Sequence, residues 1–312
     1  IGEGSVVKEI ECITNSFEKI KIKSNFFILA CGGIENSRLL LWSKEISNLN
    51  FNNLPIGHYW MEHPFIKKLA TIRNQNENLK KLFDNNMQSH TGFLDWGNKT
   101  YSFSPTKKFI KKNEILNAGL FITIHQRNND SIKNITKNIL SNNNYFSKSI
   151  LKLTNKNILS GATVSSSWEQ EPLFENRILL DNSIDFFNIP KVILNYKNGS
   201  LTKKTILKCL DALSKLLVKN KSGILNINDN FLKNNNYISD AGYHHLGGTI
   251  MGSNHYNSVV DTNLKVHNIN NLFVVGSSVF PSGGHANPTL TIIQLSLRLA
   301  EHLKLKYFKD KV

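Results

Sequence analysis

The sequence predicts a mixed α/β protein, and three stretches of the chain carry that prediction. Residues 25–41 run from an apolar segment through small residues into a leucine-rich segment, which is typical of a parallel strand leading into a crossover helix. Residues 272–303 repeat this order, with a short apolar strand, a glycine-rich turn and an apolar helix. Between them, from residue 65 to about 236, strand candidates alternate with Asn-rich loops. The pattern therefore indicates α/β layers near both ends of the chain and a strand-rich region between them.

The first stretch begins with strands. Residues 5–10 have strand character, and residues 10–23 alternate enough to predict a hairpin that leads into the apolar strand. That strand ends in Ala30, Cys31 and Gly32, and such small residues let a backbone approach a ligand closely. An ordinary strand–helix turn explains the same residues equally well, so the sequence alone leaves both interpretations open.

The middle region contains strand candidates and one long amphipathic helix. The helix is predicted over residues 201–218, where leucine and isoleucine recur on one side. A segment before this region, residues 56–64, contains two histidines and a glutamate. We do not interpret it as a metal site, because no further group of ligands supports one. The strand candidates are residues 68–73, 118–125, 161–168, 176–180 and 191–196.

The last stretch combines a His-rich loop with a helix start. The loop, residues 243–249, closes on glycines, and the strand at 272–275 ends in Gly276 and Ser277. Asn287 is a favoured N-cap and Pro288 a favoured first helical residue, so a helix should run from there to about Leu303. Its residues are apolar on nearly all sides, which predicts a buried helix. Its positive N-terminal end would suit an anionic or electron-rich ligand group.

These motifs together resemble the C-terminal signature of the glucose–methanol–choline (GMC) flavin oxidoreductases. The segment His244-His245-Leu246-Gly247-Gly248-Thr249 and the later Asn287-Pro288-Thr289 match the family in type, order and spacing. Residues 56–64, 169–172 and 176–180 also resemble family patterns, the last two being strands of an antiparallel sheet over the substrate pocket. The resemblance implies FAD as cofactor and an alcohol or sugar-like small molecule as substrate. It implies FAD contacts at Ala30, Cys31, Gly32, Gly276, Ser277, Asn287, Pro288 and Thr289.

The resemblance also suggests a mechanism. Oxidation of an alcohol by hydride transfer needs a base for the hydroxyl proton, and a neutral histidine suits that task near neutral pH. By the family register His244 is the base and Asn287 holds the substrate oxygen, while the flavin accepts the hydride. His245 is the alternative base, since adjacent side chains seldom point the same way and only one should face the flavin. We assign no role to His285.

Two departures from the family limit the resemblance. The Gly-x-Gly-x-x-Gly unit that grips the FAD pyrophosphate is absent, and Gly276 stands where many members have an aspartate. We therefore expect residues 1–64 to be part of an FAD-binding domain, 65–236 a substrate-binding domain, and 237–312 a return into the first. The chain begins at Ile1 without an initiator methionine, and we interpret it as the interior of a longer chain. A missing N-terminal half, or a separate chain, would supply the rest.

Other functions stay open. A non-catalytic flavoprotein subunit, an inactive remnant, or a lyase on the same scaffold would carry many of the same motifs.

Composition narrows the classes of partner. The formal net charge is +15, but lysine is spread along the chain without a basic helix or an aromatic-interleaved stripe. We interpret this as a solvated surface and expect no nucleic-acid partner. Three widely spaced cysteines indicate reduced thiols, which favours a cytoplasmic location. No apolar run is long enough for a transmembrane helix.

Overall fold

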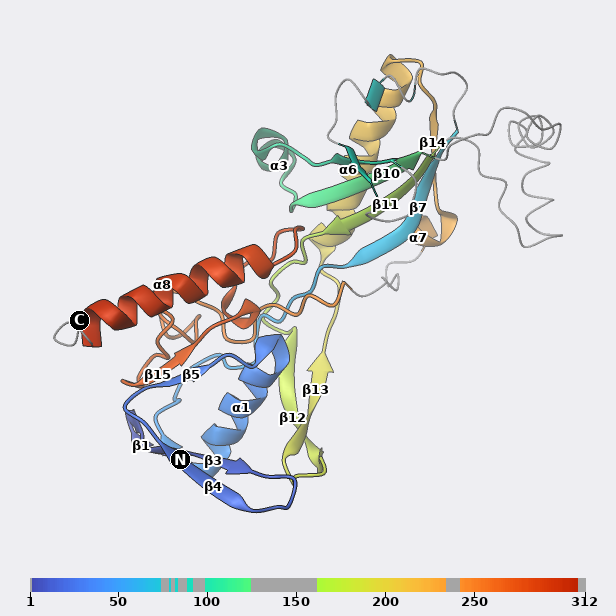
Figure 1. Cartoon of the computed structure of the whole chain (residues 1–312). Coiled ribbons are helices and arrows are strands. Elements are labelled where there is room, and N and C mark those ends of the chain that lie inside the picture. The colour runs from blue at the N-terminus through green and yellow to red at the C-terminus, as the bar shows by residue number, and fades with distance from the viewer. Residues whose placement is uncertain are drawn as a thin grey trace. The chain divides into compact units, whose positions relative to one another are not determined.

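The computed structural model describes residues 2–73, 79, 82–83, 89–91, 99–124, 162–233 and 242–307. They form two compact units, each assembled from segments distant in the chain. Unit 1 comprises Ile1–His63, Gln170–Gly199 and Tyr243–Val312, and unit 2 comprises Pro64–Glu169 and Ser200–Gly242. The predicted mixture of helices and sheets is confirmed (Figure 1).

Unit 1 contains the two strands and the two helices that the end segments predicted. The antiparallel hairpin predicted over residues 10–23 is confirmed. The pair of strands β5 and β15 is parallel, with Phe27 opposite Leu272 and Leu29 opposite Val274. The elements of this unit are β1 (Gly2–Gly4), β2 (Val6–Val7), β3 (Glu9–Ile13), β4 (Lys19–Lys23), β5 (Phe27–Leu29), α1 (Gly32–Ile46), β6 (Asn48–Leu49), β12 (Arg177–Ile184), β13 (Pro190–Asn195), β15 (Leu272–Val274), the 3₁₀ turn η1 (Ser277–Val279) and α8 (Thr289–Tyr307).

Apolar packing explains why β5 and β15 pair although they are far apart in sequence. Phe27 on β5, Leu40 on α1 and Phe273 on β15 are buried in one cluster. Removing such side chains from water is the main favourable term in folding. At the start of β15 the buried Asn271 adds polar support, because its side chain accepts from the Val7 N–H at 2.9 Å and donates to the Val7 carbonyl at 2.8 Å.

The C-terminal helix α8 is confirmed, but the prediction that it is buried is wrong. The carbonyl of Pro288 accepts the first bond from the Ile292 N–H at 3.0 Å, so the regular helix begins at Thr289. Only Leu299 of this helix is buried, whereas Leu290 is 67% exposed and Leu297 62% exposed. One side of the all-round apolar sequence packs on the core, and no described element covers the other side.

Unit 2 is a six-stranded antiparallel sheet with a long helix packed on it. The strand order is β14-β7-β11-β10-β9-β8. Helix α6, predicted over residues 201–218, runs from Ser200 to Lys219 and buries Ile206, Leu210, Leu213 and Leu217 with the sheet (Figure 1). The elements are β7 (Phe65–Arg73), β8 (Ser89–Thr91), β9 (Lys99–Phe103), α3 (Lys107–Asn113), β10 (Ala118–Ile124), β11 (Ala162–Trp168), α6, β14 (Ile224–Ile227) and α7 (Asp229–Lys233).

The structure corrects the place of two predicted strands. Residues 176–180 and 191–196 were expected in the sheet of the middle region. Instead β12 and β13 pair with one another within unit 1. Arg38 of α1 is one reason, since its guanidinium binds Asp185 at 2.7 Å and the Pro190 carbonyl at 2.7 Å. This anchors the tip of the β12–β13 hairpin to α1.

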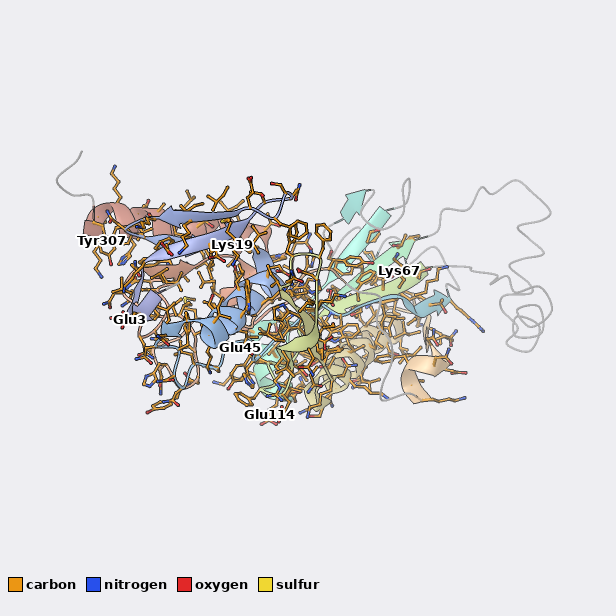
Figure 2. All side chains as sticks on the ribbon, turned by 90° about the horizontal axis from the view of Figure 1, so that it is seen from below. Glu3, Lys19, Glu45, Lys67, Glu114 and Tyr307 are labelled. Carbon is orange, nitrogen blue, oxygen red and sulfur yellow. The ribbon has the colours of Figure 1, made fainter. Side chains whose placement is uncertain are left out.

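Charged side chains lie on the surface of both units. Figure 2 labels Glu3, Lys19, Glu45, Lys67 and Glu114, which come from different elements and are all exposed. Within the described part of the chain, no helix has the length and apolar character needed to cross a membrane.

Candidate functional site

Two loops of unit 1 meet because their strands are parallel. Ala30, Cys31 and Gly32 follow β5, and Gly276 and Ser277 follow β15. Parallel neighbours end at the same edge of a sheet, and the Val275 N–H donates to the Leu29 carbonyl at 2.9 Å. Five of the predicted cofactor-binding residues therefore gather at one sheet edge, where open α/β sheets place their ligands.

The buried side chain of Asn36 joins these two loops. Its amide oxygen accepts from the Cys31 N–H at 2.9 Å. Its NH₂ group donates to the Val275 carbonyl at 3.2 Å and to the Ser278 hydroxyl at 2.8 Å. One asparagine near the start of α1 thus fixes the spacing between both strand ends. Sequence reasoning missed this residue, because a polar residue in a helix gives no sign of partners so distant in the chain.

The His-rich loop is attached to the same place. The Ser277 hydroxyl donates to the His245 carbonyl at 2.6 Å. The Gly247 and Thr249 N–H groups donate to the carbonyls of Ser277 and Ser278, each at 3.1 Å. Three loops that are distant in sequence therefore form one hydrogen-bonded assembly.

The gathered backbone fits a cofactor that approaches closely. Gly32 has a φ of 91°, and a Cβ built there would meet nothing within 4 Å. Gly276 has a φ of 120°, and the nearest atom to such a Cβ would be 3.9 Å away. Left-handed glycines beside open space are typical of loops that contact phosphates or rings. The buried hydroxyls of Ser37 and Thr249 make no hydrogen bond with a described residue.

A short backbone bridge places the side chains of the adjacent residues His244 and His245 on opposite faces of their segment. Met61 and Leu246 exchange two backbone hydrogen bonds of 2.8 Å in an antiparallel bridge. In that register His63 lies opposite His244, and successive side chains alternate between faces. The ring centroids of His63 and His244 are 5.2 Å apart. His245 instead lies 5.7 Å from the Trp60 ring.

Burial keeps His63 and His244 uncharged near neutral pH. Burial lowers the pKa of His244, while Glu62 partly opposes this and His245 adds to it. Burial also lowers the pKa of His63 to about 4, although a hydrogen bond to the Gly283 carbonyl opposes the shift. A neutral imidazole can accept a proton, which is what a general base must do.

His63 should make the free energy of unfolding depend on pH. Its pKa is about 4 in the folded chain against 6.5 ordinarily. Below about pH 6.5 the unfolded chain binds a proton that the folded chain does not. The free energy of unfolding therefore decreases as the pH is lowered from about 6.5 to about 4, by up to about 3 kcal/mol. Urea unfolding near pH 7 and near pH 4.5 measures the fall. His63→Gln should show a smaller one, and an equal fall would contradict the assignment.

The predicted site residues at the start of α8, Asn287, Pro288 and Thr289, differ in burial. Pro288 is buried, whereas the side chains of Asn287 and Thr289 are exposed. The loop before them is tied to the histidines, since His63 Nε2 lies 3.2 Å from the Gly283 carbonyl oxygen. The roles of Asn287 and Thr289 remain predictions.

Gly33 shows how closely α1 packs on the His-rich loop. A Cβ at this position would collide with the His245 carbonyl and lie 2.7 Å from its carbonyl carbon. Gly33→Ala should therefore destabilise unit 1 by about 1–3 kcal/mol through overpacking. Thermal unfolding of this variant and of the parent chain measures the loss, and an unchanged unfolding temperature would contradict the prediction.

The described residues contain no group of three or more His, Cys, Asp or Glu side chains that could hold a metal ion.

The fold is similar to that of solved oxidases. Pyridoxine 4-oxidase from Mesorbium loti aligns over 98% of this chain and 56% of its own length, with a TM-score of 0.57 and 10% identity. A formate oxidase from Aspergillus oryzae RIB40, studied for the effect of a substitution on FAD modification, aligns over 96% of this chain and 57% of its own, with a TM-score of 0.51 and 15% identity. At such identities the likeness shows the fold alone.

Sequence comparison with protein families bears on the resemblance that the motifs predicted. Residues 172–296 match the family model described as GMC oxidoreductase. This match confirms the predicted resemblance to the C-terminal portion of that family.

Curated relatives include two that align over nearly all of this chain. The fructose dehydrogenase large subunit of Gluconobacter japonicus is 24% identical over 90% of this chain and 47% of its own length. The 2-methyl-1,2-propanediol dehydrogenase of Mycolicibacterium austroafricanum is 23% identical over 94% of this chain and 50% of its own. Paromamine 6'-oxidase of Streptomyces fradiae is 31% identical over 42% of this chain and 23% of its own. This chain thus spans about half the length of the two longer matches.

Proposed function

We propose that this chain is the C-terminal portion of an FAD-dependent oxidoreductase that oxidises a CH–OH group of an alcohol or sugar-like substrate. The relatives whose names include fructose and a propanediol support that substrate class. The observation that carries the proposal is the hydrogen-bonded assembly of the loops after β5 and β15 with the His-rich loop.

Two groups of residues in this chain would contact the cofactor. Ala30, Cys31, Gly32, Gly276 and Ser277 would present backbone at the sheet edge to the cofactor. Asn287, Pro288 and Thr289 would add the positive end of α8, which favours negative charge nearby. When bound, FAD would supply the hydride acceptor.

His244 would act as the base in this proposal. Its imidazole is neutral near pH 7, because burial lowers its pKa, so it can take the hydroxyl proton of the substrate. Asn287 would hold the substrate oxygen through its side-chain amide. The side chains of His244 and His245 lie on opposite sides of the Met61–Leu246 bridge, and this supports the choice of His244. His244 lies on the same side as His63, which contacts the Gly283 carbonyl in the loop before α8.

A dinucleotide-binding unit, from a longer form of the chain or a separate chain, would complete the site. Parallel sheets are normally covered on both faces, yet Ile28 of β5 is 47% exposed. Beside it lies an apolar hollow of about 360 Å³ lined by Val275, Leu299 and Leu303. We propose that this unit packs over β5 and the exposed side of α8.

Visible absorbance tests the proposal. The purified chain is incubated with FAD and desalted, and we expect the absorbance bands of bound flavin, which an added alcohol then bleaches. Bound flavin without bleaching by any alcohol or sugar would favour a non-catalytic subunit or a lyase. If the chain stays colourless both alone and joined to the N-terminal half of a relative, the proposed cofactor is wrong.

A further inference from the structure

His63 is a buried histidine to which the proposed reaction gives no role. Its side chain is only 2% exposed. The Met61–Leu246 bridge holds it opposite His244, with ring centroids 5.2 Å apart and an interplanar angle of 72°. It is therefore placed to act on the proposed base.

The hydrogen bonding of His63 determines its tautomer. A backbone carbonyl can only accept, so the 3.2 Å contact with Gly283 requires the proton on Nε2. A neutral imidazole carries one N–H, and its other nitrogen is an acceptor. The acceptor of His63 is therefore Nδ1, which is shut off from solvent and has no hydrogen-bond partner among the described residues.

His244 requires a hydrogen-bond acceptor for its Nδ1–H if it acts as the base. Its Nδ1 is also buried and without a hydrogen-bond partner in the described part of the chain. A histidine that acts as base through Nε2 must carry its proton on Nδ1, and a hydrogen bond from Nδ1–H to a neighbour fixes this state. Such bonds are often long or poorly aligned before a substrate is bound, and the 5.2 Å between the ring centroids brings the two imidazoles close together.

We propose that His63 is the positioning residue of His244, and this rests on the proposed function. The neutral Nδ1 of His63 accepts a hydrogen bond from Nδ1–H of His244, so that Nε2 of His244 faces the substrate as a base. Gly283 in turn holds His63, which connects the base to the loop that leads to Asn287.

Two substitutions at His63 separate its two hydrogen bonds. His63→Asn places an amide oxygen close to the position of Nδ1, so it keeps the acceptor and loses the bond to Gly283. His63→Gln can still donate to the Gly283 carbonyl but leaves no acceptor at Nδ1. We expect the FAD-loaded His63→Gln chain to lose about tenfold to hundredfold in kcat with little change in KM, and His63→Asn to stay within about threefold of the parent.

The decisive measurement does not need activity. Nitrogen-15 NMR of the histidine rings in the full chain, recorded with and without FAD, reports which nitrogen of His244 is protonated. We expect Nδ1–H in the parent and in His63→Asn, and Nε2–H or a mixture in His63→Gln. Nε2–H in the parent, or an unchanged tautomer in His63→Gln, would overturn the proposal.

Glu62→Gln is the matched control, because the charge of Glu62 raises the pKa of His244. Removing the Glu62 charge should lower the pKa of His244 and leave its tautomer unchanged. A tautomer change in this variant would overturn the assignment to His63. A chain that shows the expected tautomers but binds no FAD would keep the His63–His244 pair and refute the proposed function instead.

Discussion

Replacement of His244 by alanine should slow substrate oxidation by about 10²–10⁴-fold, the usual contribution of a general base. Flavin affinity should change by less than about threefold, because the loops that gather at the sheet edge are joined by backbone groups and by Asn36. Stopped-flow bleaching of the flavin by substrate measures the first quantity, and flavin titration measures the second.

His245→Ala is the control for this prediction. Its side chain lies near Trp60 on the other side of the Met61–Leu246 bridge, so its loss should alter the bleaching rate by less than about tenfold. The backbone carbonyl that binds Ser277 is kept in this variant. If His245→Ala lost the activity and His244→Ala kept it, the roles of the two histidines would be reversed.

Replacement of Asn36 by alanine should weaken FAD binding by tenfold or more. It would leave the Cys31 N–H, the Val275 carbonyl and the Ser278 hydroxyl without their partner. Each buried polar group left unsatisfied costs about 1–3 kcal/mol, and the two strand ends would lose their fixed spacing. Flavin titration gives the affinity, and urea unfolding gives the stability.

Asn271→Ala separates the loss of affinity from a loss of stability. Asn271 is also buried and also makes three hydrogen bonds, to the Val7 N–H, the Val7 carbonyl and the Asn25 carbonyl, at the opposite end of β15. We expect a similar loss of stability with unchanged FAD affinity. If both variants weakened FAD binding equally, Asn36 would have only a structural role.

Local sequence patterns predicted much of the fold. The hairpin at residues 10–23, the strand–helix segment at 25–41 and the start of α8 depend on neighbours in the chain, so the residues themselves predict them. The pairing of β5 with β15 is not local, and the sequence patterns did not predict it. The family recognition followed from short motifs, which sequence alone can match.

What the sequence could not predict depends on distant partners. The prediction that α8 is buried was wrong, because an apolar helix has the same sequence whether or not another element covers it. The β12–β13 hairpin was assigned to the wrong sheet, since its contact with Arg38 joins residues 147 apart. Asn36 and His63 were missed for the same reason, because their roles come from the Cys31, Val275 and Gly283 backbone groups that folding brings to them.

The assembly of unit 1 from three segments has a consequence during protein synthesis. Asn36 leaves the ribosome 239 residues before Val275, one of its hydrogen-bond partners. At about 5–20 residues per second, β5 and α1 wait roughly 10–50 seconds for β15. Throughout that interval Phe27 and Leu40 lack the part of their core cluster that residues 246–299 supply, so the nascent chain presents an apolar surface to which chaperones can bind.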